Sequence, residues 1–284
     1  MNNNLTLVVV DTAFYSLAAK ALDLGVKITG AKSVLVLSDK DFYPGSTFVK
    51  IDPITDKRGY SRIMLKELGK HITTDHFMVV QYDGMPVDET KWTDDFLKYD
   101  YIGAPWAWGP ENRRVGNGGF SIRSRRLSDY CLEDAMVFDP PGYGDENFME
   151  DTHICLLYRD WLESKGINFA PVSLARKFSA ENPPGKYDTY GFHGTLCLPY
   201  YLDDEHLDFF INNMTPAQYN NDTGSRIIFG LYVAERWDHL ESMIDRGCEL
   251  IPQFKDKLIS QLIKETNHFP NLTPASLESL LINY

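Results

Sequence analysis

The chain has 284 residues, 43% of them hydrophobic, and carries 40 acidic side chains against 28 lysines and arginines, a formal net charge of −12. A chain of this length can bury roughly three quarters of its unfolded surface, so stability requires neither disulfides nor a structural metal. The acidic field repels polyanions and membrane surfaces, which disfavours a nucleic-acid partner.

The cysteines and the apolar runs indicate the compartment. The four cysteines are widely spaced and form no zinc or redox motif, so we expect reduced thiols and a cytoplasmic protein. The N-terminal residues lack the basic stretch and cleavage site of a signal peptide, and no apolar run is long enough to cross a bilayer. We therefore expect no membrane span; the sequence does not indicate the oligomeric state.

Strands and helices alternate along the first 81 residues. Residues 5–10 are apolar and β-branched, as in a strand buried on both faces, and end in Asp11-Thr12. Residues 14–24 predict a helix that Gly25 stops. Further strands are expected at 33–37, 47–51 and 77–81, and a helix at 60–68. This order predicts an α/β fold with a doubly wound sheet, where ligands collect at the strand ends.

Residues 92–119 are dense in aromatic residues, glycine and proline. Trp106 and Trp108 are candidates for a platform that stacks on a sugar or base, or they pack beneath the loop. The segment Gly116-Asn-Gly-Gly119 lets backbone approach a ligand and its N–H groups could hold oxygens, with Asn117 free to bind hydroxyls. A hairpin turn is the alternative, and the spacing fits neither a Walker loop nor a dinucleotide fingerprint.

Five arginines lie within fourteen residues around this glycine segment. A basic focus on an acidic protein suits a phosphorylated ligand, and the alternative is a solvated loop and helix start. The five are Arg113, Arg114, Arg123, Arg125 and Arg126.

The C-terminal part has helical spacing. Ser124 is expected to begin a helix, residues 150–162 form another, and Thr215-Pro216 and Thr273-Pro274 each pair a cap with a first-turn proline. The expected division is an α/β domain over 1–200 and a helical subdomain over 201–284. Within it, helices are expected at 206–211, 226–244, 254–263 and 276–282.

Two pairs of polar residues are candidates for chemistry. Asp83 at a strand end and His193 in a glycine-bracketed loop supply an oxygen and an imidazole, which suits Mn²⁺ or Mg²⁺ completed by substrate phosphates and water. Gln81 could complete or orient that shell, and an ordinary Asp-Gly turn is the alternative. Glu150 and Asp151 open a helix, either as a general base and its neighbour or as an exposed acidic cap.

Taken in order, several motifs between residues 5 and 195 resemble a poorly characterised family of GT-A-fold nucleotide-sugar glycosyltransferases found in bacteria and viruses. The motifs are specific jointly and weak singly. They are Asp-Thr at 11–12, Gln-Tyr-Asp-Gly at 81–84, Tyr-Ile-Gly-Ala-Pro-Trp at 101–106, Val-Gly-Asn-Gly-Gly-Phe-Ser at 115–121, Glu-Asp at 150–151, Phe-Ala-Pro at 169–171 and Gly-Phe-His-Gly at 191–194.

The resemblance implies a GT-A-like, Rossmann-related α/β fold with a mixed, mostly parallel central sheet flanked by helices. It also implies transfer of a sugar from a nucleotide-diphosphate donor, with UDP assumed, to an acceptor hydroxyl; inversion is expected, and a retaining pathway is the alternative. Asp83 would be the remnant of an Asp-x-Asp metal motif and His193 the distal metal ligand, with Asp151 as base and Glu150 gripping the acceptor. Position 81 is Gln rather than an acid, which puts strict metal dependence in doubt. The implied donor-binding residues are Asp11, Thr12, Tyr60, Gln81, Asn117, Gly118, Gly119, Arg114 and Arg123, with Trp106 and Trp108 on the acceptor side.

Two other functions remain open. A nucleotidyltransferase that makes nucleotide sugars would need a glycine-rich, lysine-bearing loop after the first strand, and Asp11-Thr-Ala-Phe-Tyr15 is not one. A non-catalytic carbohydrate-binding module would use the aromatic segment without needing Asp151. The acceptor is expected to be a saccharide, with hydroxylated bases of viral DNA as the alternative.

Overall fold

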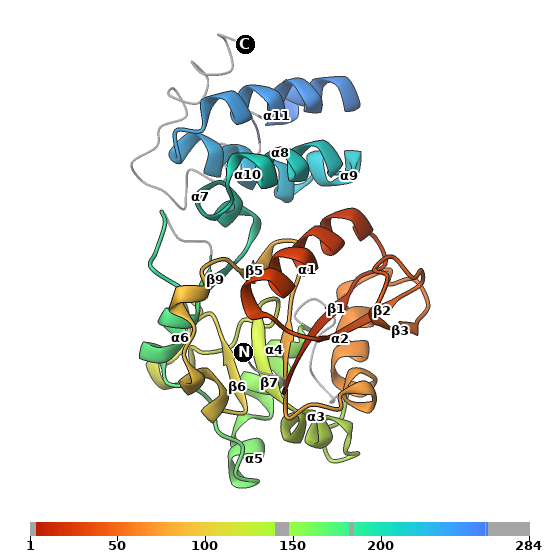
Figure 1. Ribbon diagram of the computed structural model, residues 1–284, viewed down its shortest axis with the longest axis vertical. Helices are drawn as coiled ribbons and strands as arrows, with labels where there is room; N and C mark the ends of the chain where they lie inside the picture. Colours follow the sequence, from red (N-terminus) through yellow and green to blue (C-terminus); the bar gives the residue numbers. More distant parts are fainter. Residues whose placement is uncertain (1–3, 140–147, 182–184, 259, 261–284) are drawn as a thin grey trace. The chain divides into compact units, whose positions relative to one another are not determined.

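A computed structural model describes residues 4–139, 148–181, 185–258 and 260 of the chain. The chain divides into two compact units (Figure 1). Unit 1 comprises Met1–Glu181 and Asp188–His193, and unit 2 comprises Asn182–Tyr187 and Gly194–Tyr284. The candidate site belongs entirely to unit 1.

Unit 1 is built on a six-stranded sheet in the order β3-β2-β1-β4-β7-β6. The first four strands are mutually parallel, whereas β7 pairs antiparallel with both β4 and β6. A mixed, mostly parallel sheet flanked by helices was the fold class predicted from the sequence, and it is confirmed. The strands are β1 (Leu5–Val10), β2 (Ser33–Ser38), β3 (Thr47–Lys50), β4 (His76–Val79), β6 (Tyr101–Gly103) and β7 (Ser121–Ser124).

Helices α1 (Tyr15–Thr29) and α2 (Lys57–Lys66) cover opposite faces of this sheet. Met64 of α2 packs in one core cluster with Val8 and Val10, whereas Gly25 of α1 lies against Leu7, and neighbouring strand residues point to opposite faces. The prediction that Gly25 stops the first helix was wrong. A Cβ at position 25 would lie 3.1 Å from Leu7 Cδ1, so this glycine allows close packing, and the helix ends at Gly30 with φ 63°.

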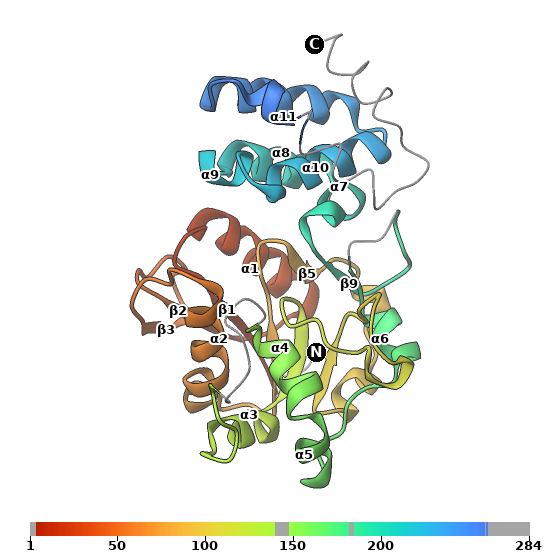
Figure 2. The ribbon, with the colours of Figure 1, turned by 180° about the vertical axis from the view of Figure 1, so that it is seen from behind.

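The remaining helices of unit 1 are short. Ser124 caps α3 (Arg125–Leu132) by accepting a hydrogen bond from Leu127 N, as the sequence predicted. The single helix expected over 150–162 is interrupted by a π-helical turn. Its first segment, α4, is labelled in Figure 2. The segments are α4 (Glu150–Thr152), the π turn (His153–Leu157), α5 (Arg159–Ser164) and α6 (Val172–Phe178), besides single 3₁₀ turns at Leu68–His71, Glu89–Lys91, Asp94–Lys98 and Glu111–Arg113.

A second sheet of three short strands joins distant parts of unit 1. It has the order β5 (Gly84–Pro86), β9 (Gly191–His193), β8 (Ser179–Glu181). Its register aligns Gly84 with His193 and His193 with Glu181. The turn that carries Asp83 is therefore placed directly beside His193.

Unit 2 is helical over its described residues. Thr215 opens α9 with a complete capping box and Pro216 in the first turn, which confirms the predicted helix start. The helix predicted over 226–244 is two helices, which separate where Glu235 adopts φ 55°. The helices are α7 (Leu198–Tyr201), α8 (Asp204–Asn213), α9 (Pro216–Tyr219), α10 (Asp222–Val233) and α11 (Trp237–Leu250), with a 3₁₀ turn at Thr195–Cys197.

Three further features complete the fold. The expected helix start at Thr273-Pro274 and the helix over 276–282 lie outside the described residues. Of the helix expected over 254–263, residues 254–258 and 260 are described and are helical. Within the described chain, no helix combines the length and apolarity needed to cross a membrane. All four cysteines are free, and Cys248 is exposed rather than in the core.

Candidate active site

A tight turn after β4 places Asp83 at the end of the sheet. Gln81 and Gly84 exchange backbone hydrogen bonds of 2.8 and 3.0 Å, so the chain reverses between them. Asp83 Oδ1 lies 4.0 Å from His193 Nε2 as a result. The Asp-Gly pair is thus an ordinary turn, and the same turn brings the carboxylate to the imidazole.

Asn117 holds the other side of the His193 ring. Its Oδ1 accepts from the backbone N–H groups of Gly119 and Phe120, which directs its Nδ2 toward Glu181 Oε1 and His193 Nδ1, each at 2.9 Å. The amide therefore donates to Nδ1. A neutral ring then carries its hydrogen on Nε2, which faces Gln81 Oε1 at 3.4 Å.

Three carboxylates act on His193. Burial by itself would lower the pKa of His193, but Asp83, Glu181 and Asp151 outweigh it and raise the pKa to about 9. The carboxylates favour the protonated form of His193. The hydrogen bond from Asn117 favours the neutral form, because a protonated ring would direct its Nδ1–H at the Asn117 amide N–H. The neutral ring fits the Asn117 amide as three other contacts hold it, whereas a protonated ring would require that amide to move.

The acid pair at the start of α4 is buried, with 4% of Glu150 and 8% of Asp151 exposed. Arg123 donates to Glu150 Oε1 at 2.9 Å and to Gly118 O at 3.1 Å, so Glu150 is held in an internal ion pair. Asp151 Oδ2 accepts from Gly118 N at 3.1 Å. Burial, with the charge of Glu150, raises the pKa of Asp151 to about 7. Asp151 is therefore poised to take up a proton near neutrality.

The glycine segment lets these groups converge. A Cβ at Gly118 would lie 2.2 Å from Glu150 Oε1, and one at Gly119 would lie 2.2 Å from His193 Nε2. The absence of side chains at these glycines thus makes room for Glu150 and His193. From the sequence, we expected that space to be taken by a ligand. Gly119 also faces the pocket, whereas Gly118 is buried behind it.

Several of these groups line one pocket of about 710 Å³, which we call the strand-end pocket. Asp83, Gly118 and Arg123 lie behind that lining and contact residues that belong to it. Tyr60 is part of the lining, and its hydroxyl accepts a hydrogen bond from Gln81 Nε2 at 2.8 Å. Of the residues proposed from the sequence, the lining includes Tyr60, Gln81, Trp106, Trp108, Asn117, Gly119, Glu150, Asp151 and His193. It also includes Lys57, Met149, Thr152, Leu156 and Glu181, which sequence reasoning missed. Glu181 had no signal, because it ends a three-residue strand.

The two tryptophans take different places in this pocket. Their rings stack on each other with centroids 4.7 Å apart and an angle of 10°. Trp106 is buried against Gly116, whereas 53% of Trp108 is exposed. Trp106 therefore packs beneath the loop and supports Trp108, and for the exposed Trp108 ring the stacking role stays a prediction.

Several proposed residues lie outside the lining. Asp11 Oδ1 accepts backbone hydrogen bonds from Ala13 and Phe14, and Thr12 Oγ1 accepts one from Ile54 N. Burial raises the pKa of Asp11, and the nearby charge of Asp83 adds to the shift. Both oxygens thus support the loop after β1.

The five clustered arginines are dispersed rather than gathered. Arg123 is 2% exposed and donates its hydrogen bonds to Glu150 and other buried groups. Arg114 forms an ion pair with Glu111 at 3.0 Å. Arg113 pairs with Asp160, while Arg126 donates to the carbonyls of Lys165 and Gly166. Arg113, Arg114, Arg123 and Arg126 thus contact four different sets of partners, and a phosphate role at this segment stays a prediction.

The fold and site define a mixed α/β protein with an acidic pocket at the strand ends. Residues 46–193, more than half of the chain, match the family described as "Protein of unknown function (DUF5672)", and the chain belongs to that family. No curated protein sequence matches it.

Similar solved structures include the following three, each at low identity. One is a mannosyltransferase, PcManGT from Pyrobaculum calidifontis in complex with GDP-Man and Mn²⁺, with TM-score 0.41 and 10% identity over 98% of this chain and 79% of that one. A glycosyltransferase involved in glycosylation of the major capsid of PBCV-1 has TM-score 0.40 and 11% identity over 66% and 93%. The apo-form glycosyltransferase GlyE in Streptococcus pneumoniae TIGR4 has TM-score 0.43 and 7% identity over 84% and 64%. The fold class rests on the chain's own topology, because all three scores are below 0.5.

Proposed function

We propose that the protein is a glycosyltransferase that moves a sugar from a nucleotide-diphosphate donor to an acceptor hydroxyl. One observation carries the proposal: a buried carboxylate with a raised pKa, Asp151, lines the same pocket as His193, which has Asp83 beside it. A general base and a set of ligands for a cation are the two groups that such a transfer requires.

The donor set suits a divalent cation by chemistry and spacing. Within the described residues, no three His, Cys, Asp or Glu side chains form a ready-made metal site, so a cation here would also take Gln81 Oε1. His193 Nε2 lies 3.4 Å from that oxygen and 4.0 Å from Asp83 Oδ1. Two ligands of one ion, each about 2.1 Å away, lie roughly 3.0–4.2 Å apart, so the spacing fits Mn²⁺ or Mg²⁺.

Binding there would require His193 to move its hydrogen from Nε2 to Nδ1. Glu181 would accept a hydrogen bond from that Nδ1–H once the Asn117 amide turned away, because Glu181 Oε1 lies 3.7 Å from Nδ1. Its other oxygen, Oε2, is buried and makes no hydrogen bond to any described residue. Glu181 would then orient the imidazole from behind, as carboxylates commonly do for metal-bound histidines.

The acidity of the pocket explains why a cation is needed. Asp83, Glu150, Asp151 and Glu181 gather here, while Arg123 is bonded to Glu150 and Lys57 is the one lysine or arginine in the described lining. A diphosphate would be repelled by this wall alone. A bound divalent cation supplies the positive charge that neutralises the departing diphosphate.

The transfer we propose is a direct displacement. Asp151 removes the proton from the acceptor hydroxyl while that oxygen forms a bond to the anomeric carbon of the donor sugar. The bond from the anomeric carbon to the diphosphate oxygen breaks, and the diphosphate leaves with the electron pair. Arg123 and Gly118 N–H hold Glu150 and Asp151 in place for this step, so Arg123 is a positioning residue. Inversion follows from a single displacement.

For the acceptor, a saccharide is favoured over nucleic acid. The exposed ring of Trp108, supported by Trp106, offers a flat apolar surface to a sugar. The dispersed arginines and the acidic wall remove the basic surface that a DNA acceptor would need. The roles that the resemblance implies for Asp11 and Thr12 toward a nucleoside, and UDP itself, stay proposals.

The other two functions have less support. In the loop after β1, the backbone N–H groups of Ala13 and Phe14 are bonded to Asp11, so they are not free to hold a triphosphate as a nucleotidyltransferase would require. A binding module would have no use for a buried base with a raised pKa.

The deciding experiment is nucleotide release from a panel of nucleotide sugars with Mn²⁺, with and without saccharide acceptors. We expect release to fall about 10²- to 10⁴-fold in Asp151→Asn and at least tenfold in Asp83→Ala. Asp160→Asn, which pairs with Arg113 outside the pocket, is the control and should retain full activity. Full activity in Asp151→Asn would overturn the proposal.

A further inference from the structure

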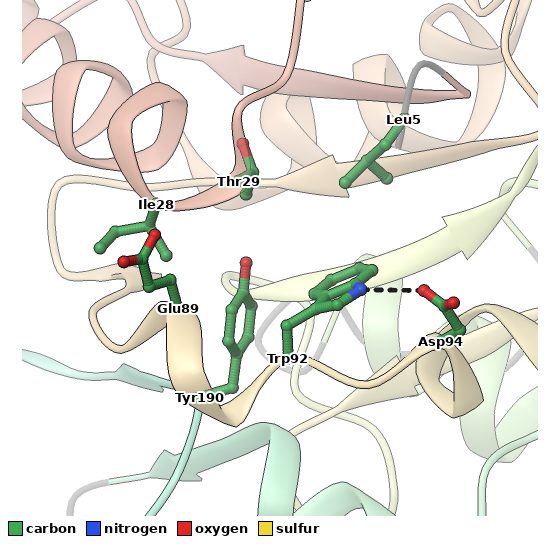
Figure 3. Close-up of a pocket in the computed structure, with 7 residues that line it drawn as sticks. All are labelled: Leu5, Ile28, Thr29, Glu89, Trp92, Asp94 and Tyr190. Carbon is green, nitrogen blue, oxygen red and sulfur yellow. Dashed lines mark hydrogen bonds between the residues drawn. The ribbon is translucent and has the colours of Figure 1, made fainter. Parts of the chain in front are cut away.

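Unit 1 has a second cavity, separate from the strand-end pocket. Its volume is about 540 Å³, within the range of small-molecule sites. It lies beside the first residue of β1 and the last turn of α1, at the opposite end of the strand from Asp11. The lining residues are Leu5, Ile28, Thr29, Glu89, Trp92, Asp94 and Tyr190, and none of them lines the strand-end pocket (Figure 3).

Tyr190 points to a ligand in this cavity. It is fully buried, yet its hydroxyl makes no hydrogen bond to any described residue. Figure 3 shows the phenol pointing toward Thr29, between Glu89 and Trp92. A buried hydroxyl without a partner destabilises a fold unless something else satisfies it.

The other lining groups define the chemistry of that ligand. Trp92 is half-buried and packs edge-on against Tyr190, with ring centroids 5.3 Å apart. Its indole N–H donates to Asp94 Oδ1 at 3.0 Å, which fixes the ring and leaves Asp94 Oδ2 as an acceptor. Glu89 supplies a second carboxylate, and the described lining contains no basic side chain. An anionic ligand is therefore excluded.

We propose that this cavity binds a neutral saccharide. A sugar ring offers apolar C–H groups on its face and hydroxyls around its edge, which match the indole and the carboxylate acceptors. Its hydroxyls both donate and accept, so they can satisfy the Tyr190 phenol in either direction. An organic cation would use the carboxylates mainly by charge, and these are exposed to solvent, where charge attraction is weak.

The site would act beside the proposed transfer site without taking part in the reaction. Glu89, Trp92 and Tyr190 reach neither Asp151 nor His193 in the strand-end pocket. The proposal concerns a different cavity and a different assay, so it holds or fails independently of the glycosyltransferase function.

The test is binding of neutral di- and trisaccharides of glucose, galactose, mannose and N-acetylglucosamine to the full chain. Calorimetry and ligand-observed NMR measure this binding. We expect at least one to bind, with Trp92→Ala weakening it at least tenfold and Tyr190→Phe about three- to tenfold. Trp237→Ala, which removes an exposed tryptophan that lines neither cavity, is the control and should not change this binding.

Stability separates a ligand role of the hydroxyl from a structural one. Tyr190→Phe should unfold at the same temperature as the unaltered chain or slightly higher, because the hydroxyl has no protein partner to lose. The proposal is overturned if no saccharide binds, if tetramethylammonium binds in place of sugars, if binding is unchanged in both variants, or if Tyr190→Phe lowers the unfolding temperature by several degrees.

Discussion

At the residue scale, the raised pKa of Asp151 suits the proposed role as a base and also lowers the free energy of unfolding at high pH. Its carboxyl is buried beside Glu150, and its pKa of about 7 lies above the ordinary value of 3.8. Between these values the folded protein holds a proton that the unfolded chain has already lost. The contribution of Asp151 to stability therefore falls as the pH rises from about 4 to 7.

Asp151→Asn should for this reason stabilise the protein at high pH. We expect its free energy of unfolding at pH 8 to exceed that of the unaltered chain by about 1–3 kcal/mol, with little difference near pH 4. Thermal unfolding at both pH values measures this. A difference that does not depend on pH would contradict the raised pKa.

The glycines of the 116–119 segment give a second prediction at this scale. Gly119→Ala would place a Cβ within 2.5 Å of His193 and of Gln81 Oε1, so the imidazole must shift. We expect at least a tenfold loss of nucleotide release and about 1–3 kcal/mol of stability. Gly185→Ala, which meets nothing within 4 Å, is the matched control. Equal effects of the two substitutions would argue against close packing at Gly119.

At the element scale, the capping box of α9 can be tested directly. Thr215 accepts from Gln218 N, and Gln218 Oε1 accepts from Thr215 N at 2.9 Å. Thr215→Ala should cost about 1 kcal/mol, or roughly 2–4 °C in the unfolding temperature measured by calorimetry. Thr223→Ala is the control, because its hydroxyl makes no hydrogen bond within the described chain. Equal losses would show that the cap contributes nothing specific.

Elements with a strong local signal could be predicted from the sequence. The strand over 5–10, the cap at Ser124 and the start at Thr215-Pro216 all follow from short-range chemistry. The three-residue strands β5, β8 and β9 could not, because so short a run has no periodicity and its register depends on distant partners. Glu181 was missed for that reason.

Charge pairing shows the same limit at the site. Asp83 and His193 could be named from their glycine-rich settings, and the structure brings them within 4.0 Å. Arg123 was assigned to phosphate because arginines cluster in sequence, but its β7 position directs it inward to Glu150. The destination of a long side chain depends on the neighbouring strand and helix, which the sequence order alone does not reveal.

At the scale of the whole molecule, an acidic chain with an acidic pocket predicts that cation and donor bind together. We expect UDP alone to leave the unfolding temperature unchanged, Mn²⁺ alone to raise it slightly, and the two together to raise it by several degrees. EDTA should abolish the shift. Differential scanning fluorimetry of the full chain measures these shifts, and Asp83→Ala is the variant that should show none. If UDP with EDTA raised the unfolding temperature as much as UDP with Mn²⁺, the cation requirement would be contradicted.

The hydrogen bond from Gly118 N to Asp151 Oδ2, at 3.1 Å, offers a reporter inside the pocket. An amide resonance is sensitive to the charge of the oxygen that it faces, so the ¹⁵N and ¹H frequencies of Gly118 should track ionisation of the carboxylate. Selective glycine labelling would then follow the proton of the proposed base spectroscopically, before any substrate has been found.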